Sequence, residues 1–186
     1  MRKIPTLFRR DPDDMRRVLP EVHPDCQWVL DGEGIATRKY DGTCVMLDEA
    51  GWWARREVKP DKTPPPNFRP EETDPTTGKT VGWEPIAQSS FAKFFDEAVA
   101  NETGHPAGTY ELCGPKINGN PEGYDTHVLV RHDAAKRFSQ MSPDALIDHC
   151  REMGYEGVVW HHPDGRMAKL KVRDLPPNTR PLPPAE

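Results

Sequence analysis

The segment from Ile35 to Leu47 constrains the fold of this chain more than any other. It alternates apolar or β-branched residues with polar ones, as a half-buried strand does, and Asp41-Gly42 interrupts the alternation. If one strand runs through the segment, Lys39 and Asp41 lie on the same face and can share a pocket. If Asp41-Gly42 forms the turn of a hairpin, Lys39 is an ordinary solvated lysine. Taken alone, the segment favours the hairpin.

Further charged residues stand inside apolar stretches. Glu111 lies in the run 108–114 and Glu156 in the run 155–160, while Lys169 and Lys171 alternate with apolar residues. Charged side chains are rarely buried unless paired, so each position marks either an outward strand face or a functional pocket. For each residue singly, the outward face is the favoured interpretation. A lysine in a pocket acts as a nucleophile when burial or nearby cations favour its neutral form.

Taken together and in this order, these residues resemble the motifs of the covalent nucleotidyltransferases, the superfamily of ATP-dependent RNA and DNA ligases and mRNA capping enzymes. The matching segments are Lys39-Tyr40-Asp41-Gly42, Arg55 within 53–56, Glu111, Glu156-Gly157-Val158-Val159 and Lys169-Leu170-Lys171. The closer likeness is to small RNA ligases, whose sequences are similar to this chain at 53–55, 110–112 and 117–123. The run Asn118-Gly119-Asn120-Pro121 predicts tight turns, and we assign it no chemistry.

The resemblance implies three successive phosphoryl transfers, in which the protein mainly positions groups and neutralises charge. Lys39 would attack the α-phosphate of ATP, release pyrophosphate and carry AMP as a phosphoramidate. The AMP would pass to an RNA 5′-phosphate, and a neighbouring 3′-hydroxyl would displace it to seal the strand. The implied activity is that of an ATP-dependent RNA ligase acting on RNA ends in RNA repair.

The resemblance also implies a role for each motif residue. Lys169 and Lys171 would hold the α-phosphate and favour the neutral form of Lys39. Glu156 would bind Mg²⁺ or Mn²⁺, with Glu111 contacting the ribose or orienting metal-bound water. The remaining assignments are Arg55 at the ribose or 5′-phosphate, Asp41 as an orienting group, and Thr37, Arg38 and Gly42 as nucleotide-binding neighbours of Lys39. Thr37 stands where many ligases have a glutamate, so base selection is expected from other groups.

The order of expected elements predicts an α+β domain. By resemblance, two antiparallel sheets with flanking helices enclose a nucleotide cleft. We expect helices over 11–18, 91–99 and 142–153, strands near 27–30, 35–39, 43–48, 51–58, 156–161 and 167–172, and a loop over 59–80 that is mobile or a lid. Residues 1–174 form one domain on this interpretation, and the proline-rich residues 175–186 a disordered tail. No sequence is left after Lys171 for the oligonucleotide-binding barrel that DNA ligases and capping enzymes usually carry.

Composition excludes several other classes. The chain has 186 residues and a net charge of −5, which argues against indiscriminate binding to nucleic acid and requires a local basic patch for RNA. Candidates for that patch are Arg2, Lys3, Arg9, Arg10, Arg16, Arg17, Arg55, Arg56, Lys59, Lys62, Arg131, Lys136 and Arg137. The 4 cysteines form no C-x-x-C pair, and adjacent residues His161 and His162 point to opposite faces, so no structural metal is predicted. No apolar run can span a membrane, and we expect a cytoplasmic protein.

Alternative functions stay open at this stage. One is a nucleotidyltransferase of the same superfamily that acts as a DNA ligase or as a GTP-using, capping-type enzyme. Another is a catalytically silent RNA-binding module that keeps the fold. All the charged motif residues are present, which favours the enzyme.

Overall fold

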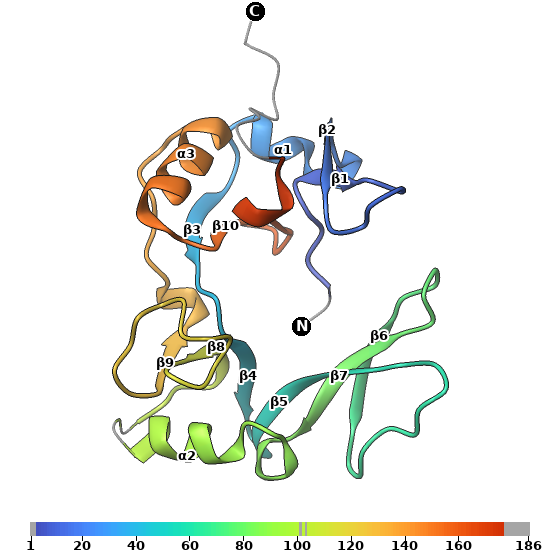
Figure 1. Cartoon of the computed structure of the whole chain (residues 1–186), viewed down its shortest axis with the longest axis vertical. Coiled ribbons are helices and arrows are strands. Elements are labelled where there is room, and N and C mark those ends of the chain that lie inside the picture. Colours follow the sequence, from blue (N-terminus) through green and yellow to red (C-terminus); the bar gives the residue numbers. More distant parts are fainter. Residues whose placement is uncertain (1–2, 101, 103, 177–186) are drawn as a thin grey trace, which may run out of the picture. The chain divides into compact units, whose positions relative to one another are not determined.

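A computed structural model describes residues 3–100, 102 and 104–176 of the chain (Figure 1). Contacts divide the chain into two compact units. The first comprises Met1–Lys3 with Asp41–Ala134, and the second comprises Ile4–Tyr40 with Ala135–Glu186. The chain therefore passes from the second unit into the first directly after Tyr40 and returns after Ala134.

The first unit contains an antiparallel six-stranded sheet with the strand order β6-β7-β5-β4-β8-β9 (Figure 1). Its strands are β4 (Thr43–Asp48), β5 (Gly51–Val58), β6 (Arg69–Thr73), β7 (Thr80–Pro85), β8 (Gly108–Cys113) and β9 (Val128–Arg131). The helix α2 (Ala92–Ala100) and two 3-10 turns, η2 (Ile86–Gln88) and η3 (His132–Ala134), complete the unit.

The core of the first unit lies between α2 and one face of this sheet. Phe95 and Ala98 of α2 are buried with a set of strand residues that includes Val45 and Leu112. Side chains alternate between the two faces of a strand. Arg55 and Glu111, each one position away from a core residue, therefore lie on the face of the sheet that α2 does not cover.

The second unit contains a three-stranded antiparallel sheet with the order β11-β10-β3, and a separate two-stranded sheet. The elements are β1 (Phe8–Arg10), β2 (Val18–Val22), η1 (Pro24–Cys26), α1 (Gln27–Leu30), β3 (Ile35–Lys39), α3 (Pro143–Met153), β10 (Gly157–His161), β11 (Met167–Lys171) and η4 (Val172–Asp174). Ser142 caps α3 by accepting a hydrogen bond from the N–H of Ala145, and Gly154, with φ +67°, ends the helix.

Leu146 and Ile147 of α3 pack against one face of the three-stranded sheet, where Val158 and Leu170 are fully buried. Because the sheet alternates, residues one position away from this core lie on the opposite face. These residues include Thr37, Lys39, Val159, Lys169 and Lys171. Apart from Arg38, which pairs with Val158, the sheet is therefore apolar toward α3, and it carries three lysines on its other side.

The structure confirms most of the predicted elements, including the two longer helices, five of the six strands near their expected bounds and the hairpin that joins β4 to β5. The hairpin at Asp41-Gly42 is wrong, because β3 pairs with β10 whereas β4 pairs with β5 and β8. The continuous strand through Asp41 is also wrong, since β3 ends at Lys39.

Three local predictions are wrong. Residues 11–18 form no helix, because Asp11 and Asp14 accept hydrogen bonds from backbone N–H groups two residues on and so form turns. Residues 27–30 form the helix α1 and not a strand. The loop 59–80 contains β6, an exposed edge strand paired with β7.

Leu175, which the sequence places at the start of the tail, is buried in the core of the second unit. Residues 177–186 of the predicted tail and Arg2 of the basic patch lie outside the described residues. Among the helices that the structure describes, none is long and apolar enough to cross a membrane.

Candidate active site

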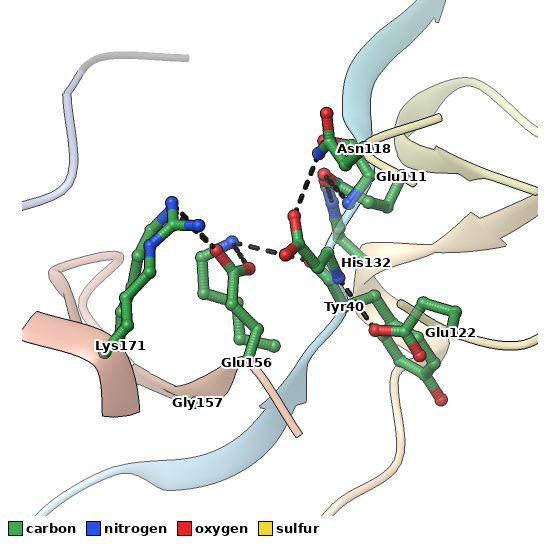
Figure 2. A network of polar contacts seen from close by, with 12 residues as sticks. Tyr40, Glu111, Asn118, Glu122, His132, Glu156, Gly157 and Lys171 are labelled. Carbon is green, nitrogen blue, oxygen red and sulfur yellow. Dashed lines mark hydrogen bonds and ion pairs between the residues drawn. The ribbon is translucent and has the colours of Figure 1, made fainter. Parts of the chain in front are cut away.

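Glu156 joins two of the predicted lysines in the second unit (Figure 2). The ammonium of Lys39 donates a hydrogen bond to Oε2 of Glu156 at 2.5 Å, and Nζ of Lys171 lies 2.6 Å from Oε1. The side chain of Glu156 is only 4% exposed. Each carboxylate oxygen therefore faces its own ammonium group in a largely water-free setting.

The strand register explains how these residues meet. Gly157, the first residue of β10, pairs with Lys39 of β3 on one side and with Lys171 of β11 on the other. Directly paired residues project from the same face of a sheet. Gly157 has no side chain to separate the two lysines, and a Cβ atom there would meet the carbonyl oxygen of Leu170 at 1.9 Å. The preceding residue, Glu156, supplies the carboxylate.

Lys169 lies on the same face of β11, two residues before Lys171. Its pKa is lowered to about 8, first because burial penalises the charged form and then because Lys39, Lys171 and Arg10 are nearby cations. In Glu156, by contrast, nearby charges together outweigh the effect of burial on the pKa. Burial raises its pKa, but the ammonium groups of Lys39 and Lys171 outweigh burial and hold the pKa below its usual range.

Thr37 and Arg38 occupy opposite faces of β3. The hydroxyl of Thr37 donates to the carbonyl oxygen of Val159 and lies 3.0 Å from Nε2 of His161, on the lysine face. Arg38 pairs with Val158 on the α3 face, and its guanidinium lies 3.7 Å from the ring centroid of Tyr155. The structure therefore does not bring Arg38 together with the three lysines.

The first unit holds a second polar cluster around Glu111, which is 8% exposed. One carboxylate oxygen of Glu111 accepts the backbone N–H of Gly42 at 3.1 Å, and the other lies 2.9 Å from Nε2 of His132. Nδ1 of His132 lies 2.9 Å from the hydroxyl of Thr109. Glu111 is therefore held between the turn that follows Lys39 and the imidazole of His132 (Figure 2).

The turn Asp41-Gly42 is also held from the segment 117–123. Nδ2 of Asn118 donates to Oδ1 of Asp41 and to the carbonyl oxygen of Gly42, each at 2.9 Å. Glu122 accepts the backbone N–H of Asp41 at 2.8 Å. Sequence analysis assigned no chemistry to this segment, although 117–123 belongs to the resemblance, because Asn118-Gly119-Asn120-Pro121 has the pattern of an ordinary surface turn.

Arg55 shares the uncovered face of the six-stranded sheet with Glu111, and its guanidinium lies 5.7 Å from the ring centroid of Trp83. Several other predicted basic residues form ion pairs. Lys3 pairs with Asp74, Arg9 with Glu21, Arg10 with Asp174, Arg16 with Asp14, Arg56 with Glu84 and Arg131 with Asp133. Their charges are thus partly neutralised within the chain.

The carboxylates of Glu156 and Glu111 fit poorly as the main ligands of a metal ion. Both oxygens of Glu156 face ammonium groups, and those of Glu111 face an N–H group and an imidazole. In the described part of the chain, no three His, Cys, Asp or Glu residues gather in a metal-binding group. A hard cation prefers several free oxygen ligands, which neither residue offers here.

No protein-family profile matches the chain. RNA ligase 1 of Rattus norvegicus is 26% identical over an alignment of 217 residues, which covers 76% of this chain and 67% of the rat protein. The chain is similar to RNA ligases. RNA ligase 1 of Pongo abelii is 24% identical over 261 residues, covering 94% of this chain and 80% of the other.

RNA ligase 1 of Danio rerio is 35% identical over a shorter stretch of 95 residues, which covers 40% of this chain and 29% of the fish protein. Against RNA ligase 1 of Mus musculus, the chain spans 66% of the relative's length. The chain is thus distantly similar to proteins named RNA ligase 1.

Proposed function

We propose that this protein is an ATP-dependent RNA ligase that joins a 5′-phosphate to a 3′-hydroxyl end through AMP carried on Lys39, in RNA repair. The observation that carries the proposal is the buried carboxylate of Glu156 between Lys39 and Lys171. A buried carboxylate paired with two lysines is not required for a stable fold, because hydrophobic residues at such positions are often equally stabilising. A functional role therefore explains these charged residues better. The similarity to proteins named RNA ligase 1 supports RNA as the substrate.

In the first step Lys39 would attack the α-phosphorus of ATP. Glu156 would orient the amine, and the positive charges of Lys169 and Lys171 would favour its neutral form. The same two lysines would neutralise the charge that develops on the α-phosphate oxygens. The N–P bond forms as the bond to the β-phosphate oxygen breaks, and pyrophosphate leaves with the electron pair.

The second cluster would act on the nucleotide sugar. Glu111 is held by Gly42 and His132, so its carboxylate has a fixed orientation suited to accept hydrogen bonds from ribose hydroxyls. Arg55, on the same face of the same sheet, would contact the ribose or the 5′-phosphate of RNA. We propose that Mg²⁺ or Mn²⁺ accompanies the phosphates of ATP, and we assign it no protein ligand.

The test is transfer of label from ATP carrying ³²P at the α-phosphate. The purified protein is first treated with pyrophosphate to discharge any AMP already bound, then incubated with labelled ATP and Mg²⁺ and denatured. Lys39→Ala should take up no label, while Lys93→Ala, which removes an exposed lysine on α2, should label normally. Glu156 keeps Lys171 as a partner in Lys39→Ala, so the variant should remain folded.

Peptide mapping and strand joining complete the test. AMP should be found on the peptide that contains Lys39, and label on the peptide of Lys169, whose lowered pKa also suits a nucleophile, would overturn the assignment. Labelled wild type should then seal 5′-phosphorylated RNA. Preference for GTP or for nicked DNA would indicate the related nucleotidyltransferases instead, and RNA binding without any labelling would indicate a silent binding module.

A further inference from the structure

The lysine face of the second unit carries more positive charge than it neutralises. Lys39 and Lys171 contact Glu156, and a guanidinium nitrogen of Arg173 lies 3.8 Å from Oε1 of the same carboxylate. Lys169 lies on the same face, where burial and the charges of Lys39 and Lys171 lower its pKa. Three cations thus contact one carboxylate, and a fourth, Lys169, lies on the same face of the sheet. Such an excess of charge suits a ligand with several negative charges.

Arg173 combines a fixed backbone with an exposed side chain. It follows Lys169 and Lys171 at the same spacing of two residues and lies in η4. NH1 of Arg17 donates to the carbonyl oxygens of Arg173 and Leu175, each at 3.1 Å. The side chain of Arg173 is nevertheless 64% exposed.

A partly buried ion pair joins the same turn to β1. NH2 of Arg10 lies 2.6 Å from Oδ2 of Asp174, and the side chain of Asp174 is only 9% exposed. Asp174 offsets the charge of Arg10, which lies near enough to Lys169 to help lower its pKa. Two arginines of the N-terminal segment therefore hold this turn, Arg17 through backbone carbonyls and Arg10 through the side chain of Asp174. The same turn carries the guanidinium of Arg173 beside Glu156.

We propose that Arg173 binds the β- and γ-phosphates of ATP, and hence the pyrophosphate that leaves when Lys39 is adenylated. This inference rests on the proposed function. A guanidinium presents a planar set of donors that matches two phosphate oxygens at once. If Lys169 and Lys171 take the α-phosphate, Arg173 continues the row of cations toward the outer phosphates. Its charge would also stabilise the pyrophosphate as the bond to the α-phosphorus breaks.

The experiment separates the step that releases pyrophosphate from the step that does not. Arg173→Gln is compared with Arg166→Gln, which removes an arginine that is 50% exposed in the turn at the opposite end of β11. The KM for ATP in label transfer, and the pyrophosphate concentration that half-discharges the labelled protein, should both rise about tenfold or more in Arg173→Gln. Sealing of RNA that already carries a 5′-adenylate should be unchanged, because that step involves no pyrophosphate. Arg166→Gln should match the wild type throughout.

Three outcomes would overturn the inference. One is an unchanged KM for ATP and unchanged discharge by pyrophosphate in Arg173→Gln. A second is normal adenylation with impaired transfer of AMP to 5′-phosphorylated RNA, which would assign Arg173 to the RNA end. A third is a large fall in the thermal midpoint of Arg173→Gln, with Arg173→Lys failing to restore the affinity for ATP.

Failure of the proposed function has a different signature. Calorimetric titration with inorganic pyrophosphate requires no activity, and it should show weaker binding to Arg173→Gln than to the wild type. If the wild type takes up no label but binds pyrophosphate through Arg173, the ligase proposal fails while the anion site stands.

Discussion

The ammonium of Lys39 lies 2.5 Å from Oε2 of Glu156, although the two residues stand 117 positions apart in the chain. Their meeting depends on the pairing of β3 with β10, which places Gly157 beside Lys39. Bringing together two segments so far apart in the chain costs conformational entropy. The attraction between the two buried charges offsets that cost only if both charged residues are present.

Glu156→Gln should strongly destabilise the protein. The substitution leaves the ammonium groups of Lys39 and Lys171 facing a neutral amide, and breaking a buried ion pair costs about 3–5 kcal/mol. Urea unfolding at neutral pH measures the change, with Glu152→Gln on the exposed side of α3 as the control. A loss no larger than that of the control would show that the carboxylate is not coupled to the lysines.

The effect of Glu156 should also depend on pH in the acid range. Its pKa is lowered in the folded protein from an ordinary value of 4.5. The ionised carboxylate therefore stabilises the fold fully above that value, and the stabilisation is lost as the pH falls through the lowered pKa. The difference in unfolding free energy between wild type and Glu156→Gln should shrink below about pH 4.5, the ordinary value. A difference that stays constant down to strongly acid pH would contradict this account.

Lys169→Met should stabilise the protein at neutral pH. The pKa of Lys169 is about 8 in the folded protein and 10.5 ordinarily, so the charged form is disfavoured by folding. That cost is fully present below pH 8 and disappears as the pH rises toward 10.5. We expect a gain of about 1–3 kcal/mol at pH 7 and almost none near pH 10.5. Chemical unfolding at both pH values tests this, and Lys93→Met should show no such dependence.

Gly157→Ala should disrupt the lysine face. The new Cβ would meet the carbonyl oxygen of Leu170 at 1.9 Å, so β10 and β11 must separate locally. Overpacking of this kind costs about 1–3 kcal/mol or more, and the contacts of Lys39 and Lys171 with Glu156 should be lost with it. Gly165→Ala is the control, because it also has a positive φ, +92°, but nothing within 4 Å of a new Cβ. Thermal melting and ATP labelling should distinguish the two variants.

Asn118→Ala should impair labelling more than folding. The variant loses the two hydrogen bonds that hold Asp41 and Gly42, so the turn after Lys39 gains freedom. We expect a fall of about tenfold or more in the labelling rate, since small displacements of positioning groups are costly. Asn67→Ala is a matched control, because Asn67 is exposed and also has a positive φ. Equal rates in the two variants would remove Asn118 from the site.

Strand existence was easier to predict than strand pairing. Residues 35–39 and 43–48 show the alternation of a half-buried strand, and both form strands. Their separation into different sheets follows from long-range pairing with β10 and β8, which leaves no mark in the local pattern. The edge strand β6 was missed because its residues are mostly exposed and polar, and Pro70 suggests a loop although an edge strand tolerates proline.

The candidate site was predictable only in its strongly charged members. Lys39, Glu156 and Lys171 stand out as charges in apolar stretches, and the structure places them together. Arg38 was grouped with them by sequence position alone, whereas strand alternation places it on the α3 face. His132 and Asn118 were missed because a histidine after a strand and an asparagine in a turn are common at positions without chemistry.

The two faces of β10 limit how this chain can change in length. Val158 and Trp160 fill the core, while Gly157 and Val159 line the side that carries the lysines. Inserting one residue into β10 would exchange these roles, so the core would receive the wrong side chains and the lysines would lose their alignment at once. The turn 162–166 contributes no residue to this core and no lysine to that face. Homologous chains should therefore differ in length at this turn and keep the strand itself unaltered.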